Sequence, residues 1–171
     1  FAVNYDFVKM IKPKSVLDVY AGFASVYKKL NCDNVISNDK NEKSNTEYHL
    51  EALDFVCKMY IDKRKFDLID LDPFGSAYDC FDLAIKMAKK GLVITLGELG
   101  HKRFKRLDFV RRYYGIETLE DFTTDNLVKH IIKIGERNKK TLTPIYVKDW
   151  RNIARVYFKI EQLKITEQWE K

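Results

Sequence analysis

Short apolar runs alternate with helical patterns along most of this chain. The apolar runs predict buried strands at residues 15–20, 34–38, 66–72 and 92–96, with a brief further strand at 47–50. Between them, apolar side chains recur at helical spacing and predict helices over residues 4–11, 24–30, 53–62, 76–90, 102–114 and 123–137. Two β-rich runs, 141–147 and 153–163, predict a terminal antiparallel hairpin. We therefore expect an α/β fold with a mostly parallel sheet flanked by helices, in a single domain over residues 1–171.

The composition is that of an intracellular globular domain. Hydrophobic residues make up 46% of the 171 residues, which is enough for a substantial core. The cysteines Cys32, Cys57 and Cys80 are odd in number and far apart, so we expect reduced, mostly buried thiols. Neither these cysteines nor the scattered histidines have the spacing of a metal site. No apolar run approaches the roughly 20 residues that cross a bilayer, and residues 1–14 lack a signal-peptide profile. We expect a soluble, cytoplasmic protein with no membrane partner.

The charge of the chain is moderately basic. A formal net charge of +6 and a pI near 9.1 suit a nucleic-acid partner without requiring one. Several of the cations fall in the predicted helix 102–114, after the loop at the carboxyl end of strand 92–96: Lys102, Arg103, Lys105, Arg106, Arg111 and Arg112. This helix is interpreted either as a surface that faces a substrate or as an ordinary solvated face.

A buried strand ends at Asp72-Pro73-Phe74-Gly75, where the proline makes the turn rigid. Asp70 and Asp72 occupy positions where a purely structural strand favours Val or Ile. One interpretation is that Asp72 only forms the turn before Pro73. The other is a pocket edge, because open α/β sheets bind ligands outside the carboxyl ends of their strands.

A small-residue turn, Ala21-Gly22-Phe23-Ala24-Ser25, follows the first predicted strand and precedes a helix. A strand, a tight turn and a helix in this order let backbone amides approach a nucleotide-like ligand. Asp39, at the end of the next strand, is where such folds hydrogen-bond ribose hydroxyls. Two structural alternatives stay open: Asp18, which precedes this turn, only forms the turn, and Asp39 is a solvated loop acid.

Together these features resemble the class I, Rossmann-like methyltransferases that use S-adenosylmethionine. The stretch from Asp18 to Ala24 is similar to their pattern of acid, any, aromatic, any, Gly, any, small, and the terminal hairpin distinguishes this class from dehydrogenases. The Asp-Pro-Phe-Gly motif is similar to that of the tRNA guanine-26 dimethyltransferase family, whose members methylate an exocyclic amine of a base. Glu51-Ala52 is similar to that family's Asp-Ala pair. The resemblance covers residues 15–96, and we expect no counterpart of the family's C-terminal RNA-binding domain.

The resemblance implies a cofactor, S-adenosylmethionine, and a set of residues that would bind it: Asp18, Tyr20, Gly22, Asp39, Glu51, Ala52 and Asp72. It implies catalytic roles for Asp72, Pro73 and Phe74, in which Asp72 accepts a hydrogen bond from the target amine and Phe74 stacks on the base. Substrate would also contact Lys102, Arg103 and Arg106. Glu51 alternatively suits an acid at a helix start.

The implied function is an S-adenosylmethionine-dependent N-methyltransferase that acts on an exocyclic amine of a nucleobase. We expect RNA as the substrate in preference to DNA, with a tRNA-like guanine as the target. Two alternatives stay open. One is a DNA amino-methyltransferase of a mobile element, and the other is a non-catalytic binding module with the methyltransferase fold. Without a recognition domain, a separate recognition subunit becomes an expected partner.

Overall fold

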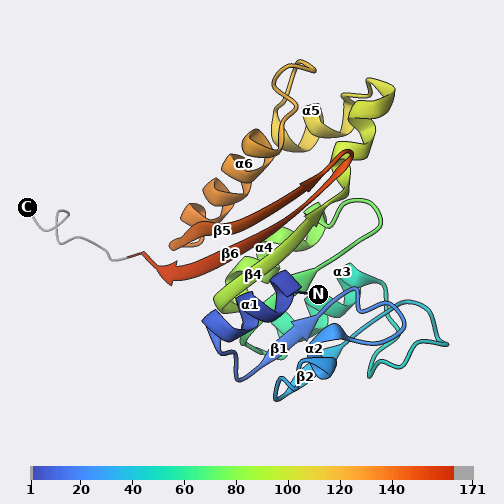
Figure 1. The fold of residues 1–171 in the computed structure, drawn as a ribbon, viewed down its shortest axis with the longest axis vertical. Helices are drawn as coiled ribbons and strands as arrows, with labels where there is room; N and C mark the ends of the chain where they lie inside the picture. Colours follow the sequence, from blue (N-terminus) through green and yellow to red (C-terminus); the bar gives the residue numbers. More distant parts are fainter. Residues whose placement is uncertain (1, 164–171) are drawn as a thin grey trace, which may run out of the picture.

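The chain forms one six-stranded sheet in the order β2-β1-β3-β4-β6-β5 (Figure 1). The computed structural model describes residues 2–163. Strands β1 (Val16–Asp18), β2 (Val35–Ser37), β3 (Phe66–Leu71) and β4 (Ala88–Leu96) are parallel to one another. Strands β5 (Lys140–Trp150) and β6 (Ile153–Gln162) form the antiparallel hairpin, and β6 lies between β4 and β5. The predicted Rossmann-like architecture with its terminal hairpin is therefore confirmed.

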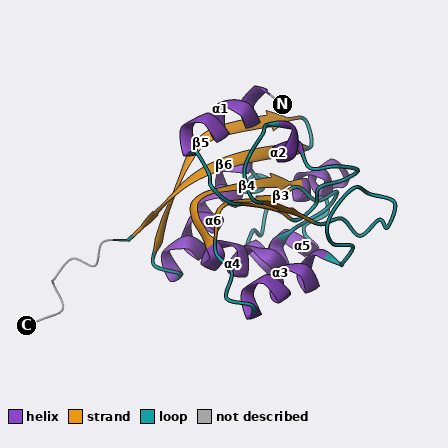
Figure 2. Ribbon diagram, turned by 90° about the horizontal axis from the view of Figure 1, so that it is seen from below, coloured by secondary structure: helices purple, strands orange, loops and turns teal. Residues whose placement is uncertain are grey.

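Helices cover both faces of this sheet, as Figure 2 shows. One face carries α1 (Ala2–Ile11) and α2 (Val26–Lys29). The other carries α3 (Ala52–Ile61), α4 (Tyr78–Met87), α5 (Asp108–Tyr114) and α6 (Thr124–Arg137). Successive strand residues point to opposite faces, so the two hydrophobic clusters divide between neighbours: Val16, Leu68 and Val93 pack under α1, whereas Leu17, Ile69 and Leu92 pack under the larger helical layer.

The brief strand predicted at residues 47–50 is wrong. Tyr48 makes only an isolated bridge with Asn38. Side chains make the other hydrogen bonds in this segment. The Glu47 carboxylate accepts the Ser37 N–H at 2.9 Å, and the Asn38 side-chain amide bonds the Leu50 backbone. Because these side chains replace a strand ladder, β3 is the third strand of the chain and lies in the middle of the sheet.

The helix predicted over residues 76–90 ends earlier, at Met87. Gly91 does not stop this helix but lies inside β4, where an added Cβ would be 3.1 Å from Leu68 Cδ1 and 3.2 Å from Phe7 Cε1. The glycine is therefore needed for close packing of β4 under α1. At the other end, Ser76 Oγ accepts the Tyr78 N–H at 3.0 Å, although Ala77 holds the N-cap position.

The single helix predicted over residues 102–114 is also wrong. Residues Gly97–Phe104 form a 3₁₀ helix, η1, and α5 begins only at Asp108. Lys105 separates them with a left-handed backbone (φ +53°), and the Lys105 and Arg106 N–H groups donate to the carbonyls of the preceding turn. Phe104, expected on the apolar face, is consequently 63% exposed.

Two smaller expectations concern cysteines and membrane spans. Cys80 is buried, but Cys32 and Cys57 are only partly buried, so the thiols are less enclosed than expected. Within residues 2–163, no helix has the length and apolarity to cross a bilayer.

Candidate functional site

Polar side chains gather on the α1 face of the sheet, near the carboxyl ends of β1, β3 and β4. Asp18 pairs in register with Asp70 on β3, so their carboxylates project side by side. Asp72 follows two residues after Asp70 and points to the same face. On β6, Arg155 pairs with Thr95 of β4. Sheet order therefore brings residues from both ends of the chain to one place.

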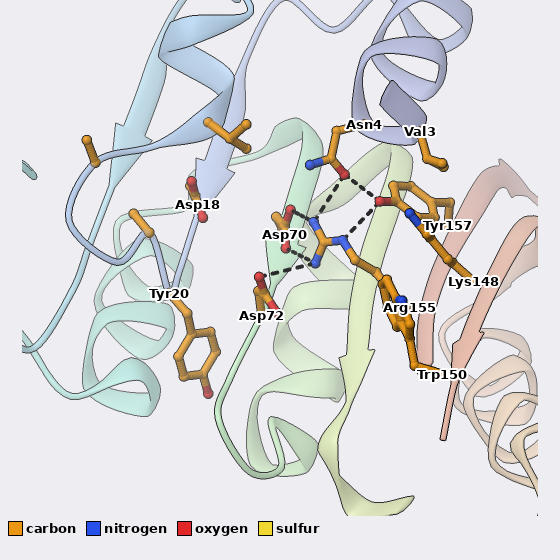
Figure 3. Close-up of a pocket in the computed structure, with 13 residues that line it drawn as sticks. Val3, Asn4, Asp18, Tyr20, Asp70, Asp72, Lys148, Trp150, Arg155 and Tyr157 are labelled. Carbon is orange, nitrogen blue, oxygen red and sulfur yellow. Dashed lines mark hydrogen bonds and ion pairs between the residues drawn. The ribbon is translucent and has the colours of Figure 1, made fainter. Parts of the chain in front are cut away.

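Arg155 is the centre of a buried hydrogen-bond network (Figure 3). Its guanidinium donates to both oxygens of Asp70, at 3.2 and 2.5 Å, and to Thr95 Oγ1 at 2.9 Å. Its Nε donates to the Tyr157 hydroxyl at 3.0 Å. Burial disfavours the charged guanidinium, but the Asp70 carboxylate outweighs it and raises the pKa of Arg155 above its usual range. The guanidinium therefore stays charged, whereas burial raises the pKa of its partner Asp70.

Asp70 and Asp18 differ in the hydrogen bonds that offset the burial of their carboxylates. Asp70 also accepts a hydrogen bond from the buried Tyr27 hydroxyl. Asp18 is 4% exposed and receives one side-chain hydrogen bond, from Ser25 Oγ at 2.6 Å. Burial, followed by the neighbouring Asp70 carboxylate, raises the pKa of Asp18 to about 8. A positive charge placed beside Asp18 would relieve this penalty.

These carboxylates line an open pocket of about 310 Å³. Figure 3 shows Asp18 and Tyr20 on one side of it and Lys148 and Trp150 of the hairpin on the other. The Asp72 side chain is 52% exposed at this pocket, 3.6 Å from the Arg155 guanidinium. The remaining lining residues come from α1, the glycine turn, α2 and β6: Val3, Asn4, Ala21, Ala24, Val26, Arg155 and Tyr157.

The glycine turn is shaped by Gly22 and Asp39. Gly22 has φ +65° and open space where a Cβ would stand. Its N–H donates to Asp39 Oδ2 at 2.9 Å, and Asp39 Oδ1 accepts the Asn41 N–H at 2.9 Å. Ser25 caps α2, with its Oγ accepting the Tyr27 N–H. Asp39 thus holds the turn in its backbone conformation and does not line the pocket.

Tyr20 borders the pocket, while its hydroxyl points away from Asp18 in Figure 3 and lies 3.9 Å from Cys80 Sγ. Burial, with the neighbouring Cys80, raises the pKa of the Tyr20 hydroxyl. The phenol therefore stays neutral, and it is the body of the side chain that borders the pocket.

The Asp72-Pro73-Phe74-Gly75 motif lies over the end of β4. Pro73 is buried, whereas Phe74 is fully exposed. A Cβ at Gly97 would be 2.2 Å from the Gly75 carbonyl oxygen, so only glycine permits this contact. The next residue, Glu98, is 1% exposed and accepts hydrogen bonds from Ser76 Oγ at 2.5 Å and the Tyr114 hydroxyl at 2.9 Å. The motif is therefore fixed at its far end to the start of η1, directly after β4, with Phe74 left exposed.

The structure separates the other predicted residues from this pocket. Glu51 is exposed at the start of α3 without a side-chain capping bond, and Ala52 is partly buried beside it. Lys102 and Arg103 line a different pocket on η1. Arg106 lies between η1 and α5, with its guanidinium 5.3 Å from the centroid of the Phe104 ring.

Sequence reasoning missed the contributions of α1 and the hairpin. Asn4 Oδ1 accepts from the Tyr157 hydroxyl at 2.5 Å and from Arg155 at 3.4 Å. Lys148 and Trp150 fall between the two predicted β-rich runs but lie within β5 and line the pocket. One available signal was Arg155 itself, a charge between apolar residues of a predicted strand, which indicates a buried partner.

Comparison with known proteins identifies related chains. A family model described as N2,N2-dimethylguanosine tRNA methyltransferase matches residues 25–168. This match begins at Ser25, the last residue of the glycine turn, and extends well past residue 96. The similarity therefore reaches further toward the carboxyl end than the motifs indicated. A comparison with curated proteins gives no match.

Several solved structures share the fold. Trm1 from Pyrococcus horikoshii, in complex with S-adenosyl-L-methionine, has a TM-score of 0.72 and 20% identity over 95% of this chain and 55% of that one. A putative SAM-dependent methyltransferase from Streptococcus mutans has a TM-score of 0.60 and 10% identity over 90% of this chain and 47% of that one. The present chain thus spans about half the length of these two. The Mtq2-Trm112 complex of E. cuniculi has a TM-score of 0.58 and 13% identity, over 94% of this chain and 93% of that one.

Proposed function

Because the chain belongs to the N2,N2-dimethylguanosine tRNA methyltransferase family, we propose that it transfers methyl groups from S-adenosylmethionine to the exocyclic amine of guanine in tRNA. The observation that carries this proposal is that Asp72, the first residue of the Asp72-Pro73-Phe74-Gly75 motif, lines an acidic pocket. The Asp72 carboxylate is exposed at this pocket, and the aromatic ring of Phe74, two residues later in the same turn, is fully exposed. A planar base with an amine donor suits both groups.

The pocket residues fit a cationic cofactor. Asp18, Asp70 and Asp72 line the pocket together with Arg155 and Lys148, and Arg155 is already engaged by Asp70. S-adenosylmethionine would supply a methyl group bound to a positively charged sulfur. Asp18 would hold that cofactor's positive charge, because a nearby cation favours the ionised form of a buried carboxyl.

The glycine turn would serve the rest of the cofactor. Tyr20 and Ala21 line the pocket, and Gly22 leaves open space for a close approach to the backbone. Asp39 lies next to this turn and keeps lone pairs for ribose hydroxyls beyond its two backbone bonds. Glu51 and Ala52 lie outside this pocket, at the start of α3, where they would face the adenine end of a cofactor that extends beyond it.

Asp72 would activate the target amine. The lone pair of an exocyclic amine is delocalised into the base, so a carboxylate that accepts its hydrogen bond draws that lone pair toward the methyl donor. Asp72 is exposed enough to receive the substrate, and Arg155, 3.6 Å away, offsets part of the repulsion between Asp72 and Asp70. Phe74 would stack on the base face, and Pro73 fixes the turn that holds both residues.

The test is methyl transfer from labelled S-adenosylmethionine to an unmodified tRNA transcript, followed by nucleoside mass spectrometry. We expect N2-methylated guanosines. Asp72→Ala should lower kcat by about 10² to 10⁴-fold, the usual contribution of a positioned acid–base group. In Asp72→Asn, KM should change less than kcat, because the amide oxygen still accepts a hydrogen bond. Cofactor affinity, measured by calorimetry, should change only a few-fold in both variants.

Asp54→Asn is the matched control, since this carboxylate is exposed on α3 and lines no described pocket. It should retain wild-type turnover. Methylation of a DNA duplex in preference to the transcript would assign the chain to DNA instead. Cofactor binding without turnover on either, or full turnover by Asp72→Ala, would refute catalysis through this motif.

A further inference from the structure

The tip of the β5–β6 hairpin borders three neighbouring pockets. Lys148 and Trp150 line the acidic pocket described above. Trp150 also lines a second pocket of about 390 Å³, together with Arg151 and Lys102. Arg151 and Lys102 continue into a third pocket of about 520 Å³, which Arg103 and Asn152 complete. These shared residues connect the acidic pocket with a basic surface along one element of the chain.

This arrangement follows from the length of the hairpin. Leu96, the last residue of β4, pairs with Ala154, so residues 150–153 extend past the end of the sheet. There the tip meets η1, and the Asn152 carbonyl lies 3.9 Å from the position of a Cβ at Gly100 (Figure 1). Two elements distant in sequence therefore form the two walls of one groove, defined by Lys102, Arg103, Arg151 and Asn152 and named here the hairpin groove.

The charges of the hairpin groove are available to a ligand. All of its charged lining residues are cations, and within residues 2–163 none of them forms an ion pair. The nearby carboxylates belong to the second pocket, where Asp149 accepts a hydrogen bond from Thr124 Oγ1 on α6 and Asp125 lies on the same helix. Arginine guanidinium groups match the geometry of phosphate oxygens, and such contacts set the position of a nucleic-acid backbone.

Exposed aromatic side chains accompany these cations. Trp150 is 46% exposed, and Lys148 Nζ lies 5.1 Å from the centre of its ring. On the other wall, the exposed Phe104 has the guanidinium groups of Arg103 and Arg106 within 5.7 and 5.3 Å of its ring centroid. Interleaved cations and aromatic rings are the surface that binds single-stranded or unpaired nucleotides.

We infer that the hairpin groove holds the RNA backbone next to the target nucleotide, and that Trp150 stacks on a neighbouring base between this groove and the acidic pocket. This inference rests on the proposed function and specifies how its substrate is held. The target base lies beside Asp72 and Phe74, and the adjoining phosphates cross Trp150 to reach Arg151, Lys102 and Arg103. A base that is flipped out of its stack needs such contacts to hold the backbone on either side of it.

The experiment measures binding of an unmodified tRNA transcript by fluorescence anisotropy across a salt titration, with S-adenosylhomocysteine present so that no methyl is transferred. The variant Lys102→Ala/Arg151→Ala should weaken binding at least 10-fold and reduce the salt slope by about 1 for each phosphate that the protein no longer neutralises. Trp150→Ala should weaken binding about 10-fold with the salt slope unchanged, and Trp150→Phe should restore most of it.

Lys9→Ala/Lys29→Ala is the matched control, because it removes two exposed cations from α1 and α2, outside every described pocket. Its affinity and salt slope should equal those of the wild type. Equal behaviour of the groove variant and this control would overturn the inference. The proposed function fails separately: a wild-type protein that binds the transcript through these residues but transfers no methyl supports the groove and refutes the activity.

Discussion

Arg155 is the residue whose loss should damage this fold most directly. It is the guanidinium partner of Asp70, which is 2% exposed. Within residues 2–163, the Tyr27 hydroxyl is the only other side-chain donor to that carboxylate. Removing one partner of a buried ion pair costs about 3–5 kcal/mol, since the other charge stays buried and uncompensated. Arg155→Met should therefore lower the free energy of unfolding by about that amount, and the melting temperature by roughly 6–20 °C for a chain of this size.

The assay is urea unfolding followed by circular dichroism, with the double variant Asp70→Asn/Arg155→Met as the control. The double variant should recover much of the loss, because neither charge is then buried alone. The deficit of Arg155→Met should also shrink from pH 8 to pH 5. Burial already raises the pKa of Asp70, and without Arg155 the carboxyl would take up a proton more readily as the pH falls. A deficit below about 1 kcal/mol, or one that does not change with pH, would refute the ion-pair reasoning.

Two further predictions concern Asp18 and Gly97. The pKa of Asp18 is raised from 3.8 to about 8, so the folded chain retains a proton that the unfolded chain releases, and stability should fall as the pH rises from about 4 to 8. Asp18→Asn should flatten this dependence by up to about 1.4 kcal/mol per pH unit in urea titrations, and an unchanged slope would contradict the assignment. Gly97→Ala should force the Gly75 carbonyl aside and lower kcat at least about 10-fold with near-normal cofactor affinity. The control Gly100→Ala, where the nearest contact of the added Cβ is at 3.9 Å, should leave kcat intact. Equal rates for the two variants would show that the motif tolerates the shift.

Local patterns were sufficient wherever neighbours in sequence decide the structure. The alternation of apolar runs with helical periods predicted the α/β sheet and its hairpin, and Pro73 with Gly75 marked the turn after β3. Prediction failed at residues 47–50 and 102–114. At the first, side-chain hydrogen bonds from Glu47 and Asn38 replace a strand, and at the second a left-handed residue, Lys105, ends η1. Neither of these features produces a clear periodic pattern of hydrophobic residues in the sequence.

By itself, then, the sequence determined the fold class, the glycine turn and the motif that places Asp72 and Phe74 at a strand end. Only the tertiary structure decided what surrounds them. Asp70 and Arg155 are 85 residues apart and meet because β6 inserts beside β4, and Trp150 reaches the pocket because the hairpin extends past the sheet. The physical reason is that hydrophobic periodicity determines which face of a strand is buried, whereas the order of the strands determines which charges share that face.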